Sequence, residues 1–93
     1  MNFDWDPEKA VSNLAKHDVS FEEASTVFGD PLSDTFDDPD HSLNEQRFII
    51  LGHSVKGWLL FVSHTDDGRT VRIISAREAT SSERNEYEEG QPN

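Results

Sequence analysis

Three arginines border the apolar runs of this sequence. Arg47 stands directly before a run that starts at Phe48, and Arg72 and Arg77 flank the residues Ile-Ile-Ser-Ala. A guanidinium stays charged at any relevant pH, and its planar fork matches two phosphate oxygens. Beside an aromatic ring on which a base can stack, such cations suit single-stranded RNA. The alternative left open is that these arginines are solvated or paired with carboxylates in weak surface ion pairs.

A second group of chemically able residues is Lys16-His17-Asp18, at the expected end of a helix. A lysine or protonated histidine is favoured there by the helix dipole, so a structural capping role is one interpretation. The functional interpretation is that His17 donates or accepts a proton, or that the pair contacts phosphate. Both interpretations stay open at the level of sequence.

Other chemistries find little support. The chain has no cysteine, which removes thiolate nucleophiles and zinc–thiolate sites. His53 and His64 fall at opposite ends of a predicted hairpin, and neither predicted helix carries histidines one turn apart, so we expect no metal site. No serine lies in a nucleophile motif and the glycines form no phosphate-binding loop. We therefore expect no cofactor.

The charge distribution complicates an RNA-binding interpretation. The net charge is −11, yet residues 46–77 carry five basic and two acidic side chains. A polyanion is slow to approach RNA, so a cationic site within an acidic shell is required. A weaker interpretation takes the acidic shell as a nucleic-acid mimic. The acidic start and the short apolar stretch Trp58–Val62 predict a cytoplasmic protein without membrane contact.

The length of 93 residues predicts one domain, 1–93, of α+β class. Asp6-Pro7 predicts a helix from Pro7 to about Lys16, and Ser20 with Glu23 predicts the start of a second helix. An acidic loop is expected at about 30–45, containing at most an edge strand. Three runs then predict an antiparallel meander, and a short helix after Thr80 and a frayed tail at about 90–93 close the chain. These runs are Arg47–Ser54, Trp58–His64 and Thr70–Arg77.

The faces of the meander follow from the commonest turns. A three-residue turn pairs Ser54 with Trp58, and an Asp67-Gly68 turn pairs Asp66 with Arg69. One face is then apolar and predicts the core, carrying Phe48, Ile50, Leu60, Val62, Val71 and Ile73. The other face carries Arg47 diagonally across from Arg72, with Ser63 opposite both Arg72 and Ile49, and with Phe61 and Ile74 beside them. Arg77 falls on the core side unless a bulge turns it outward or it lies beyond the sheet.

Several ordered segments resemble the BrnT family of toxins over residues 3 to 87. They include Trp5-Asp6-Pro7, Asn13 with Lys16-His17, the segment from Val19 to Ala24, Val27-Phe28, Glu45-Gln46-Arg47-Phe48, and the segment from Arg72 to Arg77 continuing through Ala79, Glu83, Arg84 and Tyr87. The resemblance implies a RelE-like fold with a short N-terminal strand, two helices, a three- to four-stranded antiparallel meander and a short C-terminal helix.

The resemblance also implies a function. The implied function is that of a ribonuclease toxin from a type II toxin–antitoxin system, which inhibits translation by cutting RNA. A BrnA-like ribbon-helix-helix antitoxin would neutralise it, in a heterotetramer with an antitoxin dimer. The complex would touch operator DNA only through the antitoxin. We expect metal-independent cleavage by Arg72, Arg77 and His17, with Arg47, Lys16 and Lys56 binding RNA.

Two departures from the family pattern bear on that expectation. Asp18 stands where the family usually has glycine, at a C-cap that favours left-handed backbone. Lys56-Gly57-Trp58 lacks the arginine that usually follows the glycine, which removes one cation. The alternative function is therefore a catalytically weak or inactive toxin-like module that binds its antitoxin in operon autorepression.

Overall fold

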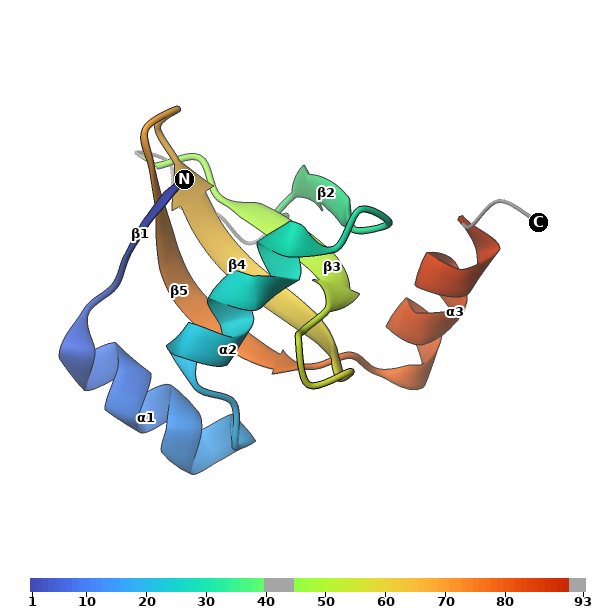
Figure 1. Cartoon of the computed structure of the whole chain (residues 1–93), viewed down its shortest axis with the longest axis horizontal. Helices are drawn as coiled ribbons and strands as arrows, with labels where there is room; N and C mark the ends of the chain where they lie inside the picture. Colours follow the sequence, from blue (N-terminus) through green and yellow to red (C-terminus); the bar gives the residue numbers. More distant parts are fainter. Residues whose placement is uncertain (40–44, 91–93) are drawn as a thin grey trace.

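The computed structural model describes residues 1–39 and 45–90 and contains a five-stranded mixed sheet with three α-helices (Figure 1). Its elements are β1 Asn2–Asp4, α1 Pro7–His17, α2 Phe21–Thr26, the 3-10 turn η1 Val27–Gly29, β2 Asp34–Asp37, β3 Phe48–His53, β4 Leu59–Asp66, β5 Thr70–Glu78 and α3 Ser81–Glu89. The strand order is β1-β5-β4-β3-β2. β1 runs parallel to β5 and the other neighbours are antiparallel. The predicted α+β class is confirmed, and the sheet gains a parallel edge strand.

The first helix forms as its flanking residues predict. The Asp6 carboxylate accepts the backbone N–H of Glu8 at 2.9 Å, and Pro7 occupies the first helical position. At the other end Asp18 adopts φ 57° and its N–H donates to the Leu14 carbonyl. Aspartate therefore takes the left-handed C-cap position, at some steric cost relative to glycine.

The second helix shows how a capping residue can be diverted. Ser20 accepts the N–H of Glu23 at 3.0 Å, which is the first half of the expected capping box. The Glu23 carboxylate itself accepts a hydrogen bond of 2.7 Å from the Ser54 hydroxyl, beyond the end of β3. Glu23 thereby ties α2 to the β3–β4 turn.

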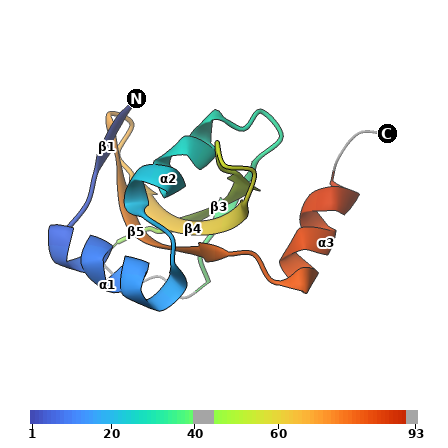
Figure 2. The same ribbon diagram turned by 60° about the horizontal axis from the view of Figure 1, so that its bottom comes forward.

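The helices α1 and α2 cover one side of the sheet, which we call the inner face. The sheet curves around α2 on this side (Figure 2). Five of the six predicted core residues, Ile50, Leu60, Val62, Val71 and Ile73, are at most 3% exposed there. They pack with Val19, Phe21, Ala24, Val27 and Ala76. Phe48 is only partly buried, and its ring lies against His64. The predicted core face is confirmed.

The register of the first hairpin is as predicted, and that of the second is not. The Ser54 N–H donates to the Trp58 carbonyl, and Asp66 lies opposite Val71 instead of Arg69. Gly68 has φ 88° and stands first in the turn, as a type II′ turn requires. This turn is centred one residue later than Asp67-Gly68.

The shifted turn moves Arg72 and is followed by an irregularity in the sheet. Arg72 pairs with Thr65, so the predicted pairing of Arg72 with Ser63 is wrong. His64 pairs with Ile73 and Ser63 pairs with Ser75, which leaves Ile74 as the extra residue of a β-bulge. After this one extra residue, each side chain of β5 points to the face opposite to the one it would occupy in a strand without the bulge. The bulge is one of the two arrangements that the sequence predicted for Arg77.

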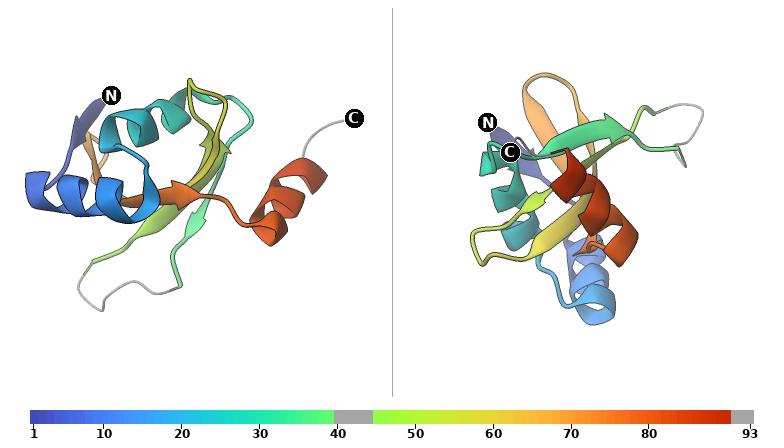
Figure 3. Two further views of the ribbon diagram at one scale, coloured as in Figure 1. Left: turned by 90° about the horizontal axis from the view of Figure 1, so that it is seen from below. Right: turned by 90° about the vertical axis from the view of Figure 1, so that its right-hand side faces the viewer.

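The third helix stands to one side of the sheet (Figure 3) and is attached mainly by Tyr87. The Tyr87 ring packs with Leu51 and Leu59, and its hydroxyl donates to Asp30 at 2.8 Å. Burial and this hydrogen bond raise the pKa of Tyr87 to about 12. Burial alone would raise the pKa of Asp30, but hydrogen bonds from the His53 and Leu32 N–H groups and from Tyr87 lower it overall.

Candidate functional site

Three predicted site residues share the face of the sheet opposite to α1 and α2, which we call the outer face. Arg77 pairs with Phe61 and Arg72 pairs with Thr65. Continuing the β3–β4 register by one residue places Arg47 beside Thr65 as well. On the outer face lie Arg47, Phe61, Ser63, Thr65, Arg72, Ser75 and Arg77, together with the buried Ile49 and Leu51 of β3.

The bulge is what puts Arg72 and Arg77 on the same face. Side chains alternate between faces along a strand, so residues five positions apart face opposite ways in a regular strand. The extra residue Ile74 corrects that parity. The two arginines lie about 15 Å apart along β5. They can therefore contact different parts of one extended ligand.

Arg72 is the most accessible of the three arginines. Its guanidinium lies 2.5 Å from the Asp4 carboxylate of the neighbouring strand β1, and both side chains are about half exposed. An exposed pair of this kind is worth at most about 1 kcal/mol, so a phosphate can displace the carboxylate at little cost. Arg47 is held in a comparable way by Glu45, at 3.2 Å.

Arg77 is held more firmly. Both its terminal nitrogens bond the two oxygens of Glu83, at 2.8 and 2.9 Å, and its guanidinium lies 4.1 Å from the Phe61 ring centre. The hydrogen bonds that Arg77 donates to Glu83 lower the pKa of Glu83 and raise the pKa of Arg77. Glu83 also accepts the Thr80 N–H in a complete capping box. The phosphate-matching fork of Arg77 is thus occupied by a carboxylate.

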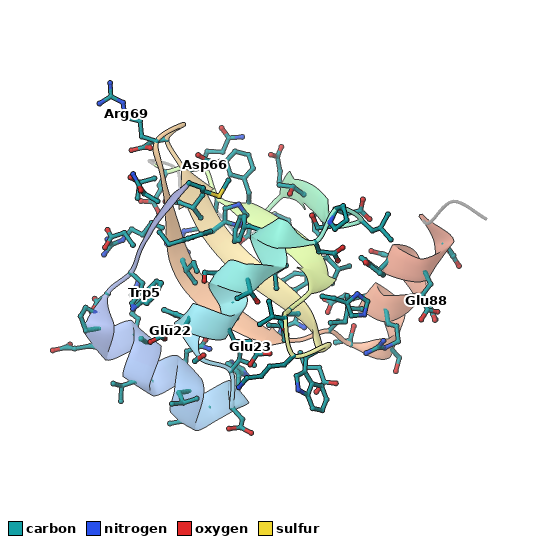
Figure 4. The ribbon with its side chains drawn as sticks, in the orientation of Figure 1. Trp5, Glu22, Glu23, Asp66, Arg69 and Glu88 are labelled. Atoms are coloured by element: carbon teal, nitrogen blue, oxygen red, sulfur yellow. The ribbon has the colours of Figure 1, made fainter. Side chains whose placement is uncertain are left out.

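His17 and Lys56 lie elsewhere, in a cleft of about 310 Å³ between the end of α1 and the β3–β4 turn. We call it the α1 cleft. Its lining residues are Leu14, His17, Asp18, Val19, Ser20, Glu23, Lys56, Trp58, Leu60 and Glu78. The Lys56 ammonium is 3.9 Å from the carboxylate of Glu23, which lies in the first turn of α2 and is labelled in Figure 4.

The six predicted site residues are therefore divided between two regions. Arg47, Arg72 and Arg77 share the outer face, whereas His17 and Lys56 line the α1 cleft. Lys16 is exposed on α1 and does not line that cleft. The two regions approach one another at the end of β5, where Arg77 is followed by Glu78, a cleft residue.

Comparison with known proteins identifies the relationship. A family model described as "Ribonuclease toxin, BrnT, of type II toxin-antitoxin system" matches residues 5–83. The chain belongs to this family. The crystal structure of the Brucella abortus ribonuclease toxin BrnT has a similar fold, with a TM-score of 0.65. The two sequences are 21% identical, and the match covers 87% of this chain and 99% of that chain. No curated protein sequence gives a significant match.

Membership of the BrnT family confirms the resemblance seen in the sequence and implies an antitoxin partner. It gives the general activity as that of a ribonuclease toxin. At this identity the Brucella structure shows the shared fold alone. In the part of the chain that the structure describes, no helix is long and apolar enough to cross a membrane.

Two groups of polar residues form hydrogen bonds that hold the fold together but are not among the six predicted site residues. The Asn13 amide donates to the Val19 and Ala76 carbonyls, at 3.0 and 2.8 Å, and accepts the Ala76 N–H at 3.1 Å. It fixes α1, and with it the α1 cleft, against β5. The one sequence signal for this role is an asparagine within a predicted helix, which is also part of the family resemblance.

The second group is formed by His53, Tyr87 and Asp30. The His53 ring nitrogen is 3.2 Å from the Tyr87 hydroxyl, and the His53 N–H donates to Asp30 at 2.8 Å. These residues come from three distant segments, so no local pattern predicts them. Within residues 1–39 and 45–90, no three histidine or acidic side chains gather in a way that would hold a metal ion.

Proposed function

We propose that this chain is a metal-independent endoribonuclease that inhibits translation by cutting RNA. Its membership of the BrnT ribonuclease toxin family supports the general activity. The observation that carries the site assignment is the outer face, where the β-bulge aligns Arg72 and Arg77 with Arg47 nearby. A RelE-type relationship of the fold is part of the same proposal.

In the proposed reaction the RNA 2′-hydroxyl attacks the adjacent phosphate, and the bond to the 5′ oxygen breaks. A base removes the proton of the 2′-hydroxyl and an acid protonates the leaving oxygen, giving a 2′,3′-cyclic phosphate and a 5′-hydroxyl. Arg72 and Arg77 stabilise the charge that develops on the phosphorane, and Arg47, Lys16 and Lys56 bind neighbouring phosphates. Metal independence is proposed because this reaction needs fixed cations and a proton carrier, and the chain offers both.

His17 is the proposed general acid or base, since an imidazole can both accept and donate a proton. It lies in the α1 cleft, so an RNA strand must cross the end of β5, past Arg77 and Glu78, to contact both regions. If the His17→Ala variant keeps full cleavage, another group moves the proton and the outer face acts without the cleft.

The first experiment incubates the purified, antitoxin-free chain with total RNA at low salt in the presence of EDTA. Low salt is used because phosphate contacts weaken steeply as salt increases. We expect cleavage with cyclic-phosphate ends. The Arg72→Ala, Arg77→Ala double variant should lose at least about 100-fold in rate, the scale for removing charge stabilisation from a transition state.

The matched control is the Arg69→Ala, Arg84→Ala double variant, which removes the same charge. Arg69 is at the tip of the β4–β5 hairpin (Figure 4) and Arg84 is on α3. It should cleave within about three-fold of the wild type, since neither arginine lies on the outer face. Equal losses in both double variants would show a general charge effect. Cleavage abolished by EDTA would contradict metal independence, and cleavage by none of the three would contradict activity on free RNA.

The carboxylate partners of the arginines favour a second candidate function. Asp4, Glu45 and Glu83 each hold one outer-face arginine, so this face is not clearly cationic. A toxin-like module that binds its antitoxin but cuts no RNA fits this arrangement. It predicts that Asp4→Asn and Glu45→Gln, which free two arginines, restore no cleavage.

The proposed partner is a BrnA-like ribbon-helix-helix antitoxin that neutralises the chain. We expect a heterotetramer with an antitoxin dimer, measurable as a molar mass by light scattering. The chain alone should not shift operator DNA, whereas the complex should, because the DNA contact belongs to the antitoxin. A DNA shift by the free chain would contradict this division of roles.

A further inference from the structure

Exposed apolar side chains gather around the α1 cleft. Seven large hydrophobic residues are exposed in the described part of the chain. Four of them belong to the two elements that border the cleft, with Val11 and Leu14 on α1 and Val55 and Trp58 at the β3–β4 turn. Leu14 and Trp58 line the cleft together with the buried Val19 and Leu60. Exposed apolar side chains that lie together on a surface mark an interaction site more often than scattered single residues do, and Leu14 and Trp58 line one cleft.

The charged residues of the same cleft are mostly acidic. Asp18, Glu23 and Glu78 line it against one lysine, Lys56, and that lysine is paired with Glu23. Three carboxylates disfavour a phosphate chain as the principal occupant. They also disfavour a second copy of this chain, which would bring the same acidic rim and a net charge of −11. A cationic partner with apolar side chains satisfies both features of the cleft.

We propose that the α1 cleft is where the antitoxin docks, through a basic amphipathic segment whose apolar side chain enters between Leu14 and Trp58. The volume of about 310 Å³ is at the small end for a binding pocket, which suits an anchoring side chain and not an extended ligand. Lysines or arginines beside the anchor would face Asp18 and Glu78. The docked segment would cover His17 and Lys56, which line the same cleft. This inference rests on the proposed function, because it names the surface used by the proposed partner.

The test compares two exposed leucines. Leu14 is 49% exposed and lines the cleft, whereas Leu32 is 48% exposed and lies outside it, before β2. The affinity of the BrnA-like antitoxin encoded with this chain is measured by titration calorimetry for the wild type, Leu14→Ser and Leu32→Ser. We expect Leu14→Ser to weaken binding at least about ten-fold, the scale for losing a buried leucine contact. Leu32→Ser should stay within about two-fold.

A second pair of variants tests the charge. Glu78→Gln removes a cleft carboxylate, and Glu88→Gln removes an exposed carboxylate of α3 that Figure 4 labels far from the cleft. Only Glu78→Gln should weaken the complex, by about three-fold, and the effect should diminish as salt is added. Folding of each variant is checked by its urea midpoint.

Two outcomes would overturn the proposal. In the first, Leu14→Ser and Leu32→Ser bind the antitoxin equally well. In the second, Trp58→Ser lowers the affinity for a short RNA and leaves antitoxin binding intact, which would assign the cleft to RNA. RNA cleavage by the free chain is assayed in parallel, so failure of the ribonuclease is separate from failure of the docking surface.

If no antitoxin complex forms, a synthetic helical peptide of leucine and lysine serves as the probe, with a leucine–glutamate peptide as its counterpart. Binding of the lysine peptide that falls at least about ten-fold in Leu14→Ser would support the chemistry assigned to the cleft. Equal binding by Leu14→Ser and Leu32→Ser, or equal binding of both peptides, would overturn it.

Discussion

The outer face and the α1 cleft both carry cations, but in opposite settings. On the outer face each arginine is held by a carboxylate, and the aromatic ring of Phe61 lies under one of them. His17 and Lys56 line the cleft together with apolar side chains and three carboxylates. The first setting suits an extended anion that replaces carboxylates, and the second suits a basic apolar segment.

The ligand that a basic side chain suits therefore depends on its neighbours as well as on its own charge. Sequence reasoning grouped six basic residues by type, and the fold separates them by what surrounds them. Substitutions in each region should therefore have different effects on RNA cleavage, stability and RNA affinity.

The largest difference is expected between one arginine of the outer face and the lysine of the cleft. Arg72→Ala should lower the rate of RNA cleavage about 100-fold or more, because a fixed charge at the phosphorane is lost. Lys56→Ala should lower it less than about ten-fold, as expected for a single peripheral phosphate contact. Single-turnover cleavage of a labelled RNA measures both. A larger loss of rate for Lys56→Ala than for Arg72→Ala would assign catalysis to the α1 cleft and not to the outer face.

The next effect concerns Asn13, which holds α1 and the α1 cleft against β5. Asn13→Ala removes three buried hydrogen bonds that fix α1 to Ala76 of β5 and to Val19. We expect the free energy of unfolding to be about 2–4 kcal/mol lower than in the wild type, because two buried carbonyls and a buried N–H lose their hydrogen-bond partner. Asn85→Ala, on the exposed side of α3, is the matched control and should change stability by under about 0.5 kcal/mol. Urea denaturation measures both, and equal midpoints would contradict the role of Asn13.

The attachment of α3 should depend on pH in the alkaline range. The pKa of Tyr87 is raised to about 12, so the folded chain retains a proton that the unfolded chain loses near pH 10. The stabilisation is therefore complete below pH 10 and is lost as the pH rises from 10 to about 12. Tyr87 is the only tyrosine, so phenolate absorbance reads it directly. A titration midpoint near 10 in the folded protein would contradict this, and Tyr87→Phe should lack the alkaline loss of stability.

The same attachment should weaken in acid. The pKa values of Asp30 and Glu83 are lowered in the folded chain, Asp30 by hydrogen bonds that outweigh its burial and Glu83 by its bonds from Arg77. Their stabilisation is present above the ordinary carboxyl pKa and is lost as the pH falls through the lowered values. Urea midpoints measured from pH 6 down to pH 3 should fall less in Glu83→Gln than in the wild type. Equal slopes would show that the Arg77–Glu83 pair contributes nothing to the acid response.

The smallest effect tests the competition between carboxylate and phosphate on the outer face. Asp4→Asn should raise RNA affinity about two- to five-fold at low salt, because Arg72 loses a competing partner. Glu22→Gln, an exposed change of the same charge on α2, should raise it less. Fluorescence anisotropy with a short labelled RNA measures both. Equal gains would show that only the net charge matters.

Much of the fold follows from local patterns. The alternation of β3, β4 and β5 predicts the inner-face core, and Asp6-Pro7 and Ser20 predict the helix starts, because these signals involve neighbouring residues. The β4–β5 register was missed because a glycine can take either central position of a two-residue turn. The penalty for burying Arg77 nevertheless predicted a bulge as one of two solutions.

The rest of the site depends on contacts between distant segments. Asp4 contacts Arg72 because β1 pairs in parallel with β5. No pattern among neighbouring residues of the sequence predicts this pairing. Glu83 lies only six residues after Arg77, in the first turn of α3. Its capping-box spacing predicts the start of the helix but not the ion pair with Arg77. The partition of His17 from the arginines likewise follows from the position of α1. Part of the acidic loop expected at 30–45, and most of the tail expected at 90–93, fall outside the described residues.

The most direct test of the division between the regions uses the five arginines as reporters. An uncleavable oligonucleotide lacking the attacking 2′-hydroxyl is titrated into the chain while the side-chain Nε–H signals are followed by NMR. We predict that Arg47, Arg72 and Arg77 shift together, and that Arg69 and Arg84 do not. Shifts confined to the indole of Trp58 and its neighbours in the α1 cleft, with the three outer-face arginines unmoved, would contradict the account.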